Sequence, residues 1–420
     1  MERRELFNRN PKQSLEEGRP RQKKVAETIS IEMAPVILAK ILNSPGGKEV
    51  LSRLFLQQDG EMYDEHKKGA KKLTDEQVAE QVTNLLQIEE RQLESVREAN
   101  KETIQIAHQD LKLIAEACQF NWRKGTEVHL VGPRMYSLYL LADNLQGELP
   151  PEKVRAGCDV GGQYFPNIDQ AVVNCQQEKE KEDQPFERFL YHAMIHEGLH
   201  SLGGKIYNQN GKVIDRGIGG GAANSIYAQA IEEGFVEWQT QEIELRHNKG
   251  SSNRYSNEVA LLEHFKEMLG DNFLKGVIIA HREGEDAKLQ SELNRIFGQG
   301  FFELYRGLNG QDSLAKHWAK MSKEEIRVFT SLVTTGERPK IVLPPYNDDK
   351  VMVAVKDHFI AIANKIMTMS LTGIPQNANR AQLLTMLPRP VRVIFQANFS
   401  VGFTIREQVE KAINEYVSGL

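Results

Sequence analysis

The sequence predicts an α+β protein that is mostly helical, with a small β-sheet set between helical regions. Apolar residues recur at helical spacing through most of the chain, and short β-like runs gather between about residues 125 and 175. The length of 420 residues exceeds what one hydrophobic core normally serves. We therefore expect a polar tail over 1–24, a helical domain over 25–123, a mixed core over 124–310 and a mostly helical region over 311–420.

Composition excludes several classes of protein. With 53 basic and 58 acidic residues and a net charge of −5, the chain has no electrostatic reason to bind nucleic acid or an anionic membrane. The longest apolar run, Ala34–Leu42, is too short to cross a bilayer. Three cysteines are too few for a disulfide framework, and residues 1–24 lack the apolar segment of a signal peptide. A cytoplasmic protein is expected, and secretion without a cleaved signal stays open.

Local signals place the elements in order. The helical region 25–123 is interrupted only at Pro35 and Gly46-Gly47, and Thr74 with Gln77 forms a predicted capping box. In the mixed core we expect a strand over 127–131, a helix over 135–145, and two tightly joined strands over 161–165 and 170–175. Further helices are expected over 186–202, about 225–247, 256–270, 271–282 and 286–306, followed by a linker over 339–345 and an ambiguous stretch over 391–403 that could be strand.

The helix over 186–202 carries the chemistry. It starts after Pro185, stops at Gly203-Gly204, and contains the pattern H-E-x-x-H as His196, Glu197 and His200. Residues four apart lie one above the other on a helix, so two imidazoles can converge on one tetrahedral zinc ion. Glu197 is turned about 100° away, where its carboxylate can take a proton from a metal-bound water. The alternative is a surface helix with two solvated histidines.

A zinc site needs a third protein ligand, and the next strong helix contains I-E-E-G-F-V-E. Glu233 and Glu237 share one face of this helix, whereas Glu232 lies off it. One carboxylate could bind the metal while the other, one turn later, holds a ligand histidine. The alternative is an acidic, solvated helix face.

Together these residues resemble the gluzincins, the clan of zinc metallopeptidases with two histidines and one glutamate on zinc. The resemblance covers about 125–305 and implies a zincin-like core within 124–310. It implies that Glu233, which precedes Gly234 in an E-G-F-x-E pattern, is the third ligand, and that Glu237 orients a ligand histidine. The strand pair over 162–174 resembles the one whose edge aligns an extended substrate in these enzymes.

Three further residues are assigned from spacing and from the resemblance. His192 and His200 are about 12 Å apart along the helix, so His192 cannot share a zinc ion with both other histidines. We interpret it as an ordinary polar residue or as a residue that supports the ligands. Gluzincins add a tyrosine or histidine that stabilises the oxyanion; Tyr255 is the chosen candidate and Tyr227 the alternative.

The predicted function is hydrolysis of peptide bonds in a peptide or protein substrate, with one Zn²⁺ per chain on His196, His200 and Glu233, and with Glu197 as general base. Two alternatives remain: a catalytically inactive zincin-fold scaffold, and a toxin- or effector-like protease. The segment 217–222 fits a dinucleotide-binding pattern only loosely, because no buried strand precedes it. The oligomeric state cannot be derived from the sequence.

Overall fold

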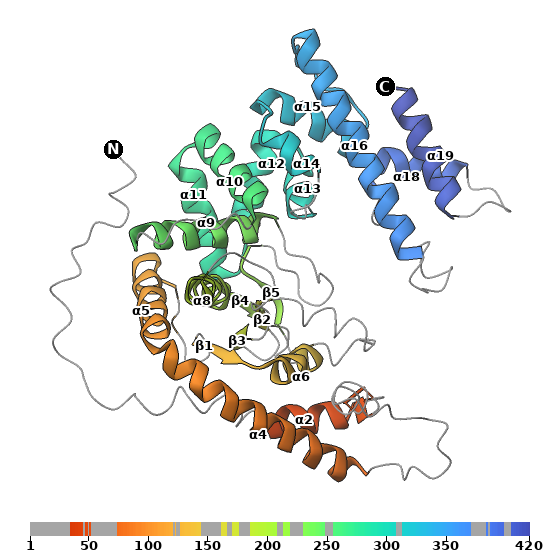
Figure 1. The fold of residues 1–420 in the computed structure, drawn as a ribbon. Coiled ribbons are helices and arrows are strands. Elements are labelled where there is room, and N and C mark those ends of the chain that lie inside the picture. Colours follow the sequence, from red (N-terminus) through yellow and green to blue (C-terminus); the bar gives the residue numbers. More distant parts are fainter. Residues whose placement is uncertain are drawn as a thin grey trace. The chain divides into compact units, whose positions relative to one another are not determined.

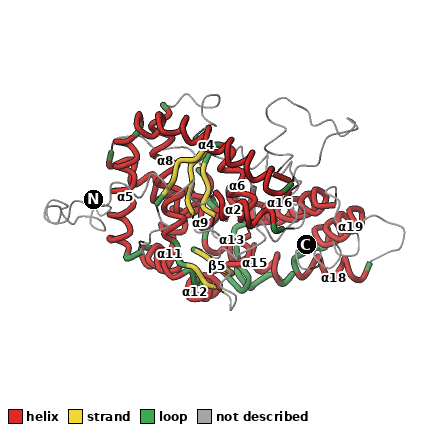
Figure 2. The backbone as a smooth tube through the Cα atoms, turned by 90° about the horizontal axis from the view of Figure 1, so that it is seen from below, coloured by secondary structure: helices red, strands yellow, loops and turns green. Residues whose placement is uncertain are grey.

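The computed structural model describes residues 34–44, 47–48, 50–51, 74–120, 122, 127–143, 161–165, 170–175, 185–207, 213–218, 230–247, 255–307, 313–370, 384, 387–398 and 405–420. These residues are mostly helical, as predicted, and Figure 2 shows how little of the backbone is strand. The tail 1–24, Tyr227 and most of the segment 217–222 lie outside the described residues. None of the described helices is both long enough and apolar enough to cross a membrane.

The bounds of the elements follow the order of the chain. The helices of the first part are α2 (Ala34–Leu42), α4 (Asp75–Ala99), α5 (Lys101–Cys118), α6 (Pro133–Asp143), α8 (Phe186–Leu202) and α9 (Ala230–Arg246). The strands are β1 (Val128–Val131), β2 (Gly162–Phe165), β3 (Gln170–Asn174), β4 (Lys205–Tyr207) and β5 (Val213–Arg216). The remaining helices are α10 (Ser256–Leu269), α11 (Asp271–Glu283), α12 (Ala287–Phe297), α13 (Phe301–Gly307), α14 (Ser313–Trp318), α15 (Lys323–Thr334), α16 (Pro345–Ser370), α18 (Arg389–Ala397) and α19 (Ile405–Ser418).

Contacts divide the chain into two compact units. The first comprises Met1–Ile214 and Gln239–Ser252, and the second comprises Asp215–Trp238 and Asn253–Leu420. The division runs through α9, which is one unbroken helix from Ala230 to Arg246. The position of every side chain on α9 therefore follows from the same helix axis.

The first unit contains a three-stranded sheet in the order β1-β3-β2 (Figure 1). β1 pairs with β3 in parallel and β2 pairs with β3 antiparallel, which confirms the predicted strands, whereas the turn predicted between β2 and β3 lies outside the described residues. Successive strand residues point to opposite faces. Phe165 on one face packs against Tyr136 and Tyr139 of α6, while α8 packs on the other face.

Helix α8 has the predicted bounds and is buried on nearly all sides. The sheet covers one side, and α5 packs on another. Two buried or half-buried hydrogen bonds join α5 to α8: the Tyr191 hydroxyl donates to Asp110 at 2.6 Å, and Thr103 donates to Glu187 at 2.7 Å. A helix that is buried on most sides must pack against other elements all around. Its few polar side chains are therefore shielded from solvent.

The N-terminal helices of this unit use the predicted capping. Thr74 and Gln77 form the capping box at the start of α4. Pro35 does not interrupt a helix, because it lies in the first turn of α2, where its missing N–H costs no helical hydrogen bond. From α4, the carboxylate of Glu89 accepts the backbone N–H groups of Arg134 and Met135, so it satisfies the first turn of α6.

The second unit is helical around an aromatic core. The Phe301 ring lies 5.7 Å from Phe265 and 4.9 Å from Trp318, centroid to centroid. The helix expected over 286–306 is divided into α12 and α13, because Gly298 has a positive φ of 111° that ends α12. The stretch over 391–403 is not strand where it is described: residues 391–397 belong to α18, and burial of Val391 and Phe395 one turn apart selects the helix.

Candidate metal centre

Helix α8 presents three histidines along one side. The exposed fractions of His192, His196 and His200 are 5%, 4% and 9%. The alternative of a surface helix with solvated histidines is therefore wrong, because the sheet and α5 cover this helix. Helix α9 contributes carboxylates: Glu237 is fully buried and Glu233 is partly exposed. The alternative of a solvated acidic face does not hold for Glu237.

Among the described residues, two groups of side chains could hold a metal ion, and one consists of His196, His200 and Glu233. One ligand atom from each residue lies within 4.8 Å of the others. The Nε2 atoms of His196 and His200 are 3.3 Å apart. Zinc–nitrogen bonds of about 2.0–2.1 Å at a tetrahedral angle separate two ligand nitrogens by about 3.3 Å. Two neutral imidazoles can also share one N–H at this distance. The donor set and its spacing fit zinc.

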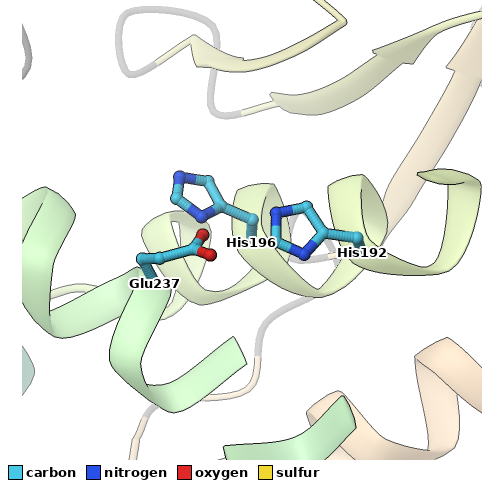
Figure 3. A group of neighbouring side chains, drawn as sticks. All are labelled: His192, His196 and Glu237. Carbon is cyan, nitrogen blue, oxygen red and sulfur yellow. The ribbon is translucent and has the colours of Figure 1, made fainter. Parts of the chain in front are cut away.

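The second group consists of His192, His196 and Glu237, again with one ligand atom from each residue within 4.8 Å of the others. Figure 3 shows the Glu237 carboxylate beside the ring of His196, and His192 one turn away on α8. The carboxylate predicted to orient a ligand histidine is thus next to His196. His192 does not join His200 in either group, in agreement with the length of helix between them.

Glu197 follows His196 and faces the edge of the sheet. Gly162 of β2 has no side chain, and a β-carbon there would lie 2.9 Å from Cγ and 3.3 Å from Oε1 of Glu197. Within the described part of the chain, β2 is one of the two edge strands of its sheet. The predicted general base therefore lies close to strand β2.

Two further carboxyl groups surround the start of α9. Glu232 accepts the backbone N–H of Ile218 at 2.9 Å and lies 3.0 Å from Nδ1 of the buried His281. Both partners belong to the second unit, so Glu232 stabilises that unit. Glu258 of α10 is buried, and burial, followed by the charges of Glu233 and Glu237, raises its pKa. The predicted distinction between Glu232 and Glu233 agrees with these positions, and zinc binding by Glu233 stays a prediction.

The oxyanion-stabilising residue also stays a prediction. Tyr255 is exposed and precedes the first residue of α10. Glu244 of α9 was not among the predicted site residues, and its Oε1 lies 3.1 Å from Nδ1 of His192. The signal was available, because Glu244 follows Glu237 by two helical turns and therefore lies on the same side of α9.

Two imidazoles and a carboxylate that converge at one point, with a further carboxylate on the adjacent helix position, are suited to metal-assisted hydrolysis. The buried surroundings strengthen each electrostatic interaction in such a site. Comparison of the chain with protein-family models, with curated proteins and with solved structures found no match.

Proposed function

We propose that this protein is a zinc-dependent metallopeptidase of the gluzincin type, with a zincin-like core. The proposed zinc ligands are His196, His200 and Glu233, and the proposed general base is Glu197. The single observation that carries the proposal is the 3.3 Å separation of the His196 and His200 Nε2 atoms, with a carboxylate of Glu233 in the same group.

Zinc bound to these residues would polarise the scissile carbonyl and lower the pKa of the attacking water. Glu197 accepts the proton of that water and returns it to the leaving amine nitrogen. Glu237, beside the ring of His196, keeps that imidazole in the orientation and tautomer that a ligand requires. Tyr255 is proposed to donate a hydrogen bond to the developing oxyanion.

The edge strand β2 supports a peptide as the substrate. An extended peptide can add to a sheet edge through main-chain hydrogen bonds, without a requirement for particular side chains. Because a β-carbon at Gly162 of this strand would lie 2.9 Å from Cγ of Glu197, a peptide aligned along β2 would bring a carbonyl group near the proposed general base.

The decisive experiment compares Glu197→Gln with the wild-type chain. Elemental analysis should find about one zinc per chain in both, because Glu197 is not a ligand. Cleavage of a diverse peptide library should fall about 10²–10⁴-fold in the variant, as expected for removal of a general base. Circular dichroism of both proteins serves as the control for folding.

Two results would contradict the proposal. A wild-type chain that binds no zinc would remove the metal centre. A wild-type chain that binds zinc and cleaves no peptide would leave the inactive scaffold as the better description.

A further inference from the structure

The buried group of His192, His196 and Glu237 is not used as a ligand set in the proposed function. Each of the three residues is at most 5% exposed, so the group is more deeply buried than Glu233 of the first group. Its ligand atoms lie as close together as those of the first group, within 4.8 Å. Figure 3 shows the two imidazoles and the carboxylate gathered on adjoining turns of α8 and α9.

A second, independent observation concerns the far side of His192. Oε1 of Glu244 lies 3.1 Å from Nδ1 of this imidazole. Histidines that bind metal commonly donate their other ring N–H to a carboxylate, which fixes the tautomer and raises the basicity of the ligand nitrogen. With Nδ1 engaged in this way, Nε2 is the nitrogen of His192 that can bind a metal ion.

The electrostatics of this region also point to a cation. Glu237 and Glu244 are both fully buried, and Oε2 of Glu244 has no hydrogen-bond partner within the described part of the chain. Burial of a carboxylate oxygen without a partner is costly unless a positive charge compensates it. Two imidazoles and one carboxylate are ligands that suit zinc.

We propose that His192, His196 and Glu237 form a second zinc position, with Glu244 as the carboxylate that orients His192. The first position is the zinc site of the proposed function, on His196, His200 and Glu233, and this inference rests on that proposal. Because His196 serves both positions, the second one is occupied when the first is lost. A zinc ion there has neither His200 nor Glu233 as a ligand, so it lacks two of the three ligands of the proposed catalytic site.

The test measures zinc affinity by competition with a chromophoric chelator, with zinc alone as the probe. His200→Ala should still bind one zinc ion, more weakly than wild type by more than about 100-fold, since a ligand of the first position is gone. The double variant His200→Ala/His192→Ala should lose a further factor of about 100 or more. Equal affinity in the single and double variants would overturn the inference.

The controls separate this inference from the proposed function. His264→Ala in the His200→Ala background removes a histidine of α10 that belongs to neither group, so it should leave the residual affinity unchanged. If wild type binds zinc and His200→Ala binds none, only the second position fails. If wild type binds none, the proposed function fails. Should the double variant not fold by circular dichroism, Glu237→Gln in the same background replaces it and should also lose the residual zinc.

Discussion

Gly162 and the side chain of Glu197 lie so close together that a β-carbon at Gly162 would be 2.9 Å from Cγ of Glu197. The backbone carbonyl of Val172 would lie 3.2 Å from the same β-carbon, so the strand offers little room for adjustment. The absence of a side chain at this edge-strand position therefore decides where the carboxylate of the proposed general base can lie.

Gly162→Ala should displace that carboxylate without removing a metal ligand. We expect unchanged zinc content and a loss of peptide cleavage of about ten-fold or more, because misplacement by about 1 Å can cost up to about 10²-fold in rate. Gly276→Ala is the matched control: its β-carbon would make ordinary contact with Leu289, so activity should not change. Full activity of Gly162→Ala would show that this contact does not position Glu197.

Glu237→Gln should keep zinc but release it to a chelator more readily than wild type. A carboxylate that supports a ligand histidine typically contributes about 10–100-fold to metal affinity, less than a ligand does. Glu233→Gln, titrated beside it, should lose more than about 100-fold in zinc affinity, because it removes a ligand and not only a carboxylate that supports one. If the two variants behave in the opposite order, Glu237 is the third ligand, and if neither loses affinity, neither carboxylate acts on the metal.

Glu232→Ala should retain zinc and lower stability. Its carboxylate accepts the Ile218 N–H and pairs with His281, which is fully buried, so truncation leaves these donors without their partner. The expected cost is about 1–3 kcal/mol in the free energy of unfolding. Zinc analysis and thermal unfolding, measured on one preparation, test this prediction. Loss of zinc without loss of stability would show that Glu232, and not Glu233, is the zinc ligand.

His129 should make the first unit sensitive to acid. Burial, with smaller contributions from His108 and Arg97, lowers the pKa of this imidazole to about 4. A histidine with a lowered pKa in the folded state contributes stability above its unfolded pKa of about 6.5, and that stability is lost as the pH falls toward about 4. The loss amounts to about 3 kcal/mol.

His129→Leu removes this titration, so its urea unfolding midpoint should fall less than that of wild type between pH 7 and pH 4.5. The Nε2 atom of His129 has no hydrogen-bond partner within the described residues, so leucine sacrifices no bond there. Parallel midpoints for the two proteins across this range would show that His129 does not titrate in the folded state at the expected pH.

The sequence by itself determined the elements that carry the candidate site. The bounds 186–202 of α8 were predictable because Pro185 and Gly203 are local start and stop signals, and the helix period places His196 and His200 on one side. The strands β2 and β3 were predictable from two short β-like runs on either side of the turn residues 166–169. These signals act within a few residues of the chain, where backbone geometry alone decides the outcome.

Only the tertiary structure decided which carboxylate meets which histidine. The positions of Glu237 beside His196 and of Glu244 beside His192 depend on how α9 packs against α8, and helix periodicity says nothing about that register. Residues 391–397 are a second example, because a short run with β-branched residues is locally compatible with either a helix or a strand. Burial of Val391 and Phe395, one helical turn apart, favours the helix. Side-chain packing between segments distant in sequence settles such choices, since each one depends on partners that the local pattern does not contain.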